Sequence, residues 1–219
     1  MQAEVQNLRN ETVQLSEEIR TATDTLRDLH RAGIERVYSQ RGGAALINEW
    51  KTLAAGAARI DLLGLTMYHE WLYYQELKDL LLTVSCRSGG EVRILVLPPS
   101  RESNEDAPDA WETNPNYMLR RRQPGEDNGH VLKGYLESAH ESLSDLTAKA
   151  SGKHLEIRFL RACTPYCMLV RIDSYMYVAP YLSSAQGEDS FAMAVRDPSD
   201  LFSLYLGEFE AIWRSEAGS

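Results

Sequence analysis

IDLLGL at residues 60–65 and VRILVL at residues 92–97 are the two apolar runs that decide the fold. Both are short, rich in Leu, Ile and Val, and followed by polar or turn-forming residues, which is typical of buried strands. Residues 70–87, between them, have the apolar spacing of a helix. The order strand, helix, strand predicts a parallel pair joined by a right-handed crossover, with the helix packed on the sheet.

Further elements are expected on both sides of this unit. Apolar residues at helical spacing predict helices at 44–58, 130–150 and 200–215, and short apolar runs predict strands at 155–160, 167–172, 176–179 and 191–195. Asp173 and Ser174 form a hairpin turn between two of these strands. We therefore expect an α/β fold, a mixed sheet flanked by helices, in one domain at 33–219. Residues 98–129 lack periodicity, which is typical of a functional or disordered loop.

The N-terminal segment, residues 1–32, has the pattern of a coiled-coil helix. Steps of three and four along the chain connect apolar or small side chains over about four heptads, namely Val5, Leu8, Thr12, Leu15, Ile19, Ala22, Leu26 and Leu29. β-Branched residues at one seam position and Leu at the other favour a parallel two-stranded coil. We expect a homodimer through residues 1–32; the alternative is that this stripe packs on the chain's own domain.

Composition excludes several classes of protein. The net charge of −9 argues against extended nucleic-acid binding, and 43% hydrophobic residues are typical of a folded domain. Three cysteines, Cys86, Cys163 and Cys167, do not suggest a disulfide framework. The longest apolar runs are shorter than the ~20 residues that cross a bilayer. We expect a cytoplasmic protein without a membrane span.

Several short blocks give the chain a resemblance to phospholipase D-like domains. They are RVYSQR (36–41), ARIDLLGLTM (58–67), EVRILVLPPS (91–100), LEIRFLRACTPYCMLVRID (155–173) and FEAIWRS (209–215). The blocks are similar to single-half domains that bacteria append to helix-turn-helix regulators and other signalling proteins. This resemblance implies a phospholipase D-like fold over residues 34–215.

The resemblance also implies loss of catalysis. Active members carry HxKxxxxD followed by GSxN, in which the His attacks phosphorus and the Lys and Asn hold the phosphoryl oxygens. Aligned on Asp173, this pattern places Tyr166 and Met168 at the His and Lys positions. Pro180, Tyr181 and Ser183 fall at the Gly, Ser and Asn positions. Because a phenol and a thioether do not replace His and Lys, the resemblance implies a pseudoenzyme.

Candidate ligand-binding residues lie at the same end of the expected sheet. Thr66 and Tyr68 follow the first strand, where open α/β sheets bind ligands. Tyr166 and Met168 share one strand face and either form the floor of a pocket or fill it as core. In the long loop, Arg120 and Arg121 are either phosphate ligands or part of a solvated charged run. The whole candidate set is Thr66, Tyr68, Arg120, Arg121, Tyr166, Met168, Asp173, Tyr181 and Ser183.

Three hypotheses of function follow. The first is a non-catalytic sensor or interaction module that dimerises through its coil and binds a small phosphate-bearing ligand, such as a nucleotide, and a partner protein. The second is a phosphodiesterase, nuclease or phospholipid-processing enzyme that uses other residues, such as His130 and Lys133. The third is an inert oligomeric scaffold. The five histidines show no metal-binding spacing, and we expect no metal and no cofactor.

Overall fold

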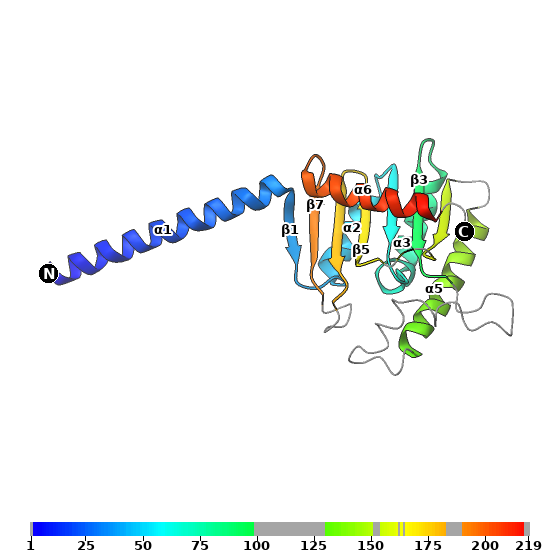
Figure 1. Cartoon of the computed structure of the whole chain (residues 1–219), viewed down its shortest axis with the longest axis horizontal. Helices are drawn as coiled ribbons and strands as arrows, with labels where there is room; N and C mark the ends of the chain where they lie inside the picture. Colours follow the sequence, from blue (N-terminus) through cyan, green and yellow to red (C-terminus); the bar gives the residue numbers. More distant parts are fainter. Residues whose placement is uncertain are drawn as a thin grey trace.

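The fold is a seven-stranded mixed sheet with helices on both faces, seen in a computed structural model that describes residues 2–98, 130–150, 154–161, 163, 165–182 and 190–216. The strand order is β1-β7-β6-β5-β2-β3-β4 (Figure 1). Their bounds are β1 (Ile34–Tyr38), β2 (Arg59–Leu63), β3 (Glu91–Val96), β4 (Leu155–Phe159), β5 (Cys167–Ile172), β6 (Tyr175–Pro180) and β7 (Ala192–Arg196). Strands β2, β3 and β4 are parallel neighbours, and the other pairs are antiparallel.

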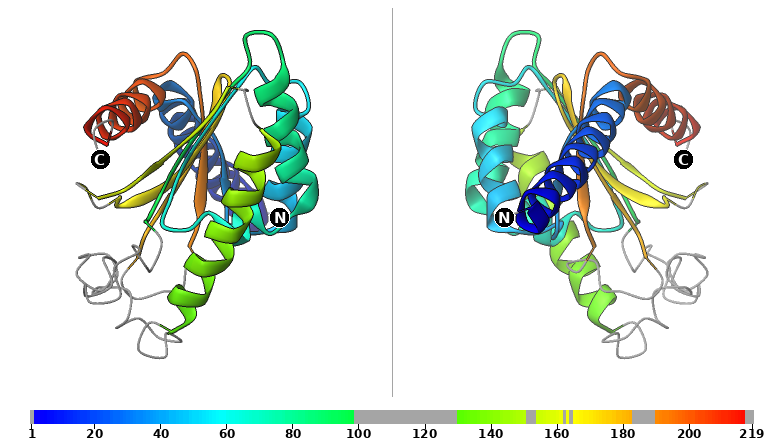
Figure 2. Two further views of the ribbon diagram at one scale, coloured as in Figure 1. Left: turned by 90° about the vertical axis from the view of Figure 1, so that its right-hand side faces the viewer. Right: turned by 90° about the vertical axis from the view of Figure 1, so that its left-hand side faces the viewer.

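The helices form two unequal layers (Figure 2). Helices α2 (Ala44–Ala54), α3 (Gln75–Cys86) and α5 (His130–Lys149) cover one face, and α6 (Asp200–Ser215) covers part of the other. Helix α1 (Gln2–Ala32) projects away from the sheet (Figure 1). None of the helices in the described ranges has a stretch long and apolar enough to cross a membrane.

The strand–helix–strand unit predicted from the sequence is confirmed, because β2 and β3 pair in parallel across α3. The predicted hairpin at Asp173 is also confirmed between β5 and β6. The predicted helix at 70–87 is divided into a five-residue π-helical turn, η1 (Tyr68–Leu72), and α3. Strand β1 was not predicted as a strand. It lies at the sheet edge with most of its side chains exposed, so its sequence carries little apolar signal.

Successive side chains of β2 point to opposite faces of the sheet and so contribute to the hydrophobic core on both faces. Ile60 and Leu62 pack with α2 and α3, whereas Leu63 packs towards α6. Asp61 lies on the α6 side and is fully buried. The two faces of this central strand are therefore chemically different, with an ionised side chain placed within one of them.

Three arginines satisfy the buried carboxylate of Asp61. Arg93 donates from Nε (2.7 Å) and Nη2 (3.0 Å), Arg171 donates from Nη1 (3.1 Å), and Arg59 from Nε (3.2 Å). Arg93 on β3 and Arg171 on β5 are the direct cross-strand partners of Asp61. A shift of one residue in either pairing would move these charges to the opposite face, so the network fixes the register.

The same arginines attach α6 to the sheet. Arg93 Nη2 lies 2.7 Å from Glu210 Oε1, and Arg59 Nη2 lies 3.4 Å from the same oxygen. The Arg93 guanidinium also lies over the rings of Phe209, at 4.6 Å, and Trp213, at 5.1 Å. Charge-assisted hydrogen bonds and cation–π contacts therefore hold this helix in place together with its apolar face.

A tight junction joins α1 to the sheet at Gly33. This residue has a positive φ of 88°, its carbonyl accepts from the Arg196 N–H at 3.0 Å, and its N–H donates to the His30 carbonyl at 3.0 Å. A Cβ at this position would lie 2.0 Å from Oγ of Ser199, the residue that caps α6. Both the conformation and the space available therefore require glycine.

Glu210 provides a test of the network. The hydrogen bond from Arg93 holds the pKa of the Glu210 carboxyl below its ordinary value, and the charges of Arg93, Arg59 and Arg171 act in the same direction. The carboxylate therefore stabilises the fold above its unfolded pKa of about 4.3, and this contribution is lost as pH falls through the lower folded pKa. Because the side chain is partly exposed, we expect Glu210→Gln to lower the free energy of unfolding by about 1 kcal/mol at neutral pH.

Urea unfolding of both proteins across a pH series measures this difference, which should shrink as pH falls through the lowered folded pKa of Glu210. Glu208→Gln on the same helix is the control, since Glu208 has no ion pair within the described residues. An equal loss in both variants, or a loss that does not depend on pH, would contradict the assignment.

Candidate functional site

The carboxyl ends of β2 and β3 form an edge of the sheet at which several polar and aromatic side chains meet. Pairing continues past β2, because the Gly64 N–H donates to the Leu95 carbonyl at 3.0 Å and the Leu97 N–H donates to the Leu65 carbonyl at 2.9 Å. The segment then turns into η1. Ligands of open α/β sheets commonly bind at such carboxyl ends.

The turn after β2 has an unusual backbone. Met67 is fully buried and has a positive φ of 52°, a conformation that costs roughly 1–3 kcal/mol in a non-glycine residue. The π-helical η1 follows at once, and the Tyr68 N–H donates to Thr66 Oγ1 at 3.2 Å. Single π-helical turns and strained residues occur preferentially at functional sites.

Arg41, Glu70 and Tyr181 come together at this edge from three parts of the chain. Arg41 follows β1, and its Nη2 lies 3.0 Å from Glu70 Oε1 in η1. The side chains are only 11% and 9% exposed. The Arg41 guanidinium lies 5.2 Å from the ring centre of Tyr181, whose hydroxyl accepts from the Leu65 N–H at 2.9 Å. A nearly buried ion pair and an aromatic ring therefore line the end of β2.

A group of aromatic side chains adjoins the ion pair on the helical side. Tyr68 stacks on Tyr135 of α5 with ring centres 6.1 Å apart, and His69 meets the same ring edge-on at 4.2 Å. Tyr73 contacts Tyr68 and is largely exposed. These rings join η1 to α5 and present apolar and polar atoms to solvent.

Thr66, Tyr68 and Tyr181, three of the candidate residues, are thus placed at one edge of the sheet. Asp173 lies at the opposite end, in the turn between β5 and β6. Its carboxylate accepts from the backbone N–H groups of Ala58, at 3.1 Å, and Arg59, at 2.8 Å. Asp173 therefore anchors the hairpin to the start of β2.

The other candidates do not form a common floor. Met168 is 1% exposed and packs in the core with α2 and α3, as in the alternative that assigned it to the core. Tyr166 is 56% exposed and precedes β5. Arg120, Arg121 and Ser183 lie outside the described residues.

Arg41 and Glu70 were not predicted as site residues. Arg41 ends the block RVYSQR and precedes Gly42-Gly43. A charged residue directly before such a chain break was the one feature of the sequence that could have indicated a site residue here. Its partner is 29 positions away in sequence, as the difference between 70 and 41 gives. Only the pairing of β1, through β7 and β6, with the rest of the sheet brings them together.

Nucleophilic groups elsewhere are poorly suited to catalysis. Burial raises the pKa of the Cys163 thiol to about 11 and that of Cys167 to about 12, so both stay protonated at neutral pH. No group of three or more His, Cys, Asp or Glu side chains within the described ranges could hold a metal ion. For His130, proposed with Lys133 for an enzymatic alternative, the structure describes the backbone but not the side chain.

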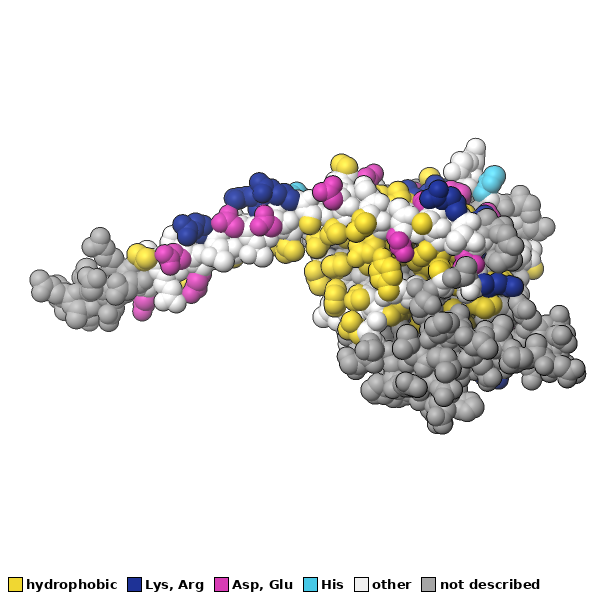
Figure 3. Space-filling view, in the orientation of Figure 1, with side chains coloured by type: hydrophobic (Ala, Val, Ile, Leu, Met, Phe, Trp, Pro, Cys, Tyr) yellow, Lys and Arg dark blue, Asp and Glu magenta, His cyan; other side chains and the backbone are white. Residues whose placement is uncertain are grey.

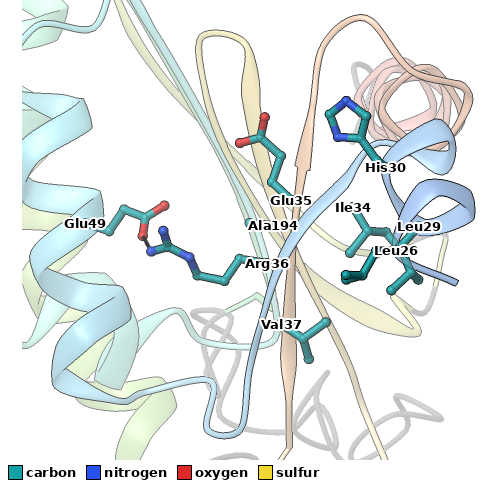
Figure 4. A pocket seen from close by; sticks show the side chains of 9 residues that line it. All are labelled: Leu26, Leu29, His30, Ile34, Glu35, Arg36, Val37, Glu49 and Ala194. Atoms are coloured by element: carbon teal, nitrogen blue, oxygen red, sulfur yellow. Dashed lines mark hydrogen bonds and ion pairs between the residues drawn. The ribbon is translucent and has the colours of Figure 1, made fainter. Parts of the chain in front are cut away.

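A second feature is a hollow of about 550 Å³ where α1 meets the edge strand β1 (Figure 4). Leu26, Leu29, Ile34 and Val37 supply its apolar wall. Arg36, which pairs with Glu49 at 2.9 Å, supplies a polar wall. The hollow thus lies beside the outer edge of the sheet, where β1 has no further neighbour among the strands that the structure describes.

Exposed apolar side chains extend from this hollow onto the α6 side of the sheet. Val37 is opposite Met193 of β7, which packs against the α6 layer, and Phe191 and Leu204 are also exposed. In Figure 3, hydrophobic side chains gather on this face of the domain, close to the base of α1. An apolar area of this kind is typical of an interaction surface.

Comparison with known proteins finds a likeness to solved structures but to no family model or curated protein. A solved structure of TrmBL2, described as an archaeal chromatin protein with a novel mode of DNA binding, matches with a TM-score of 0.48 and 15% sequence identity. The match covers 96% of this chain and 66% of TrmBL2, so the chain spans slightly less than two thirds of that protein.

These findings correct two predictions. The phospholipase D-like assignment was wrong: no family model or curated protein supports it, and TrmBL2 is among the solved structures that match. The expectation that nucleic acid is an unlikely partner is also corrected, since it conflicts with the match to TrmBL2, a protein described as binding DNA. The physical reason is that a net charge of −9 is a sum over the chain and does not set the charge of one face. At this level of similarity the likeness assigns no function to this chain.

Gly64 tests the packing of the edge after β2. A Cβ at Gly64 would lie 2.5 Å from Met67 Sδ and 3.0 Å from Tyr181 Oη. We expect Gly64→Ala to lower the free energy of unfolding by about 1–3 kcal/mol through overpacking. Chemical denaturation measures this, with Gly56→Ala as the matched control because a Cβ at Gly56 meets no atom within 4 Å. Equal effects of the two substitutions would show that the edge is loosely packed.

Proposed function

We propose that this protein is a dimeric, non-catalytic interaction module, in which the α1 helices of two copies pair as a parallel coiled coil. The observation that carries the proposal is the exposure of the apolar stripe of α1. Residues 11–31 are all exposed, and Ile19 and Leu26 are 64% and 66% exposed in the single chain. This exposure supports pairing with a second copy over packing of the stripe on the chain's own domain.

An isolated helix of this kind gains little stability from its own backbone. Most helical stability in proteins comes from packing of an apolar face, and α1 contacts the domain mainly where it enters β1. Burying the side chains of Leu15, Ile19, Leu26 and Leu29 contributes roughly 6–12 kcal/mol per chain, at 1.5–3 kcal/mol each. Association costs roughly 4–15 kcal/mol, so two such seams are sufficient to hold a dimer together.

The heptad pattern favours a second copy over an unrelated partner. Within residues 11–31, position a carries Thr12, Ile19 and Leu26, and position d carries Leu15, Ala22 and Leu29. Ile19 at a, with Leu at two of the three d positions, suits self-pairing in parallel register. Parallel pairing would place both domains at the same end of the coil. The apolar hollow at the base of α1 would then lie next to the second copy, which would supply further apolar contact.

The seam is tested by introducing the same charge on two sides of α1. Ile19→Asp places a carboxylate in the proposed seam, whereas Thr21→Asp places it on the outer side of the same helical turn. We expect the wild type and Thr21→Asp to have the mass of a dimer in sedimentation equilibrium. Ile19→Asp should weaken dimerisation by at least about 100-fold, because burying an unpaired charge costs several kcal/mol.

Circular dichroism on the same samples shows whether each variant keeps its folded domain. A wild-type protein that is monomeric at micromolar concentration would refute the proposal, and so would an Ile19→Asp variant that dimerises as tightly as Thr21→Asp.

A further inference from the structure

We propose that Arg41 and the turn after β2 form a binding site for an oxyanion, the phosphate or carboxylate group of a small ligand. This inference goes beyond dimerisation and does not depend on it, because every residue that carries it belongs to one chain. It rests on hydrogen-bond donors that the fold buries and leaves without acceptors.

Arg41 is held firmly but is only partly satisfied. Its backbone N–H donates to the Ser190 carbonyl at 2.8 Å, and its Nη2 pairs with Glu70. Its Nε and Nη1 are buried and have no acceptor in the part of the chain that the structure describes. Leaving a buried charged group with unmade hydrogen bonds costs roughly 1–3 kcal/mol or more, so such groups call for an explanation.

The indole N–H groups of Trp50 and Trp71 are also buried without an acceptor among the described residues, but these two rings stack on each other in the core. The unmatched donors at the ion pair itself are therefore the two Arg41 nitrogens. No buried side-chain acceptor of the described residues is unmatched in this region. A ligand that satisfied the two nitrogens would have to supply oxygen acceptors, and the guanidinium favours the oxygens of phosphate or carboxylate.

The surroundings agree with a binding site. The donors lie at the carboxyl end of a parallel strand, beside a strained Met67 and a π-helical turn. The ring of Tyr181 covers the guanidinium, and Thr66 and Tyr68 are in the same turn. By contrast, all three side-chain nitrogens of Arg93 are hydrogen-bonded, so unmatched donors are not a general property of the buried arginines of this fold.

Glu70 should limit the affinity of the site. Its carboxylate already occupies Nη2 of Arg41, and it would repel an incoming anion. Glu70→Gln keeps an oxygen acceptor for Arg41 but removes the competing charge. The variant should therefore bind an oxyanion more tightly than the wild type does, a result that a purely structural ion pair would not give.

The experiment titrates the full chain with inorganic phosphate and, separately, with acetate, following the thermal unfolding midpoint against sodium chloride at equal ionic strength. We expect the oxyanion to raise the midpoint of the wild type beyond the effect of chloride. The more effective of phosphate and acetate identifies the ligand group. Apparent affinity should increase about tenfold in Glu70→Gln and fall about tenfold in Arg41→Gln, a change of about 1.4 kcal/mol.

Arg36→Gln is the matched control, because Arg36 belongs to the strand before Arg41 and also pairs with a glutamate. Its response to the oxyanion should equal that of the wild type. If Arg41→Gln does not fold, Arg41→Lys and Glu70→Gln decide the matter, since Lys keeps the charge but loses the planar fork. An oxyanion effect no larger than that of chloride, or an equal response in the wild type and Glu70→Gln, would overturn the proposal.

Discussion

The buried carboxylate of Asp61 lies at the centre of the sheet, and arginines of three strands converge on it. An ionised group without partners could not occupy this position, because its desolvation would exceed the stabilisation that the surrounding core supplies. With Arg93 and Arg171 directly opposite on the neighbouring strands, the charge instead selects one register for both pairings. The parallel half and the antiparallel half of the sheet meet at this residue, so its network joins the two halves of the fold.

Two groups of charges in the sheet differ in how completely they are satisfied. Around Asp61, the arginine donors are matched by Asp61, Glu210 and Glu91. At the carboxyl end of β2, Arg41 has one carboxylate partner and two nitrogens without an acceptor among the described residues. The first group is therefore structural, and we assign binding to the second. Ionic networks that stabilise a fold and ionic groups that await a ligand can be distinguished here by counting donors and acceptors.

The central part of the fold could be predicted from sequence because its elements are apolar and local. The run VRILVL, for example, correctly predicted strand β3. Strand β1 could not be predicted in the same way, since an edge strand buries few side chains. The candidate site was recovered only in part: Thr66, Tyr68 and Tyr181 lie together, but Asp173 is a turn residue at the far end. Arg41 and Glu70 could not be predicted as site residues, because they come together only through a contact between distant parts of the chain. Hydrophobic periodicity predicts local secondary structure and carries no information on such contacts.

Because α1 is long and joins the sheet at Gly33, a small change of direction at this glycine would displace the far end of the helix by a large distance. Helix α1 has 31 residues and is therefore about 46 Å long, at about 1.5 Å per residue. A rotation of about 10° at Gly33 would move the far end of the helix by about 8 Å over that length. Gly33 lies against Ser199, the residue that caps the start of α6. The direction in which α1 leaves the domain is therefore set by the packing of two residues at its base.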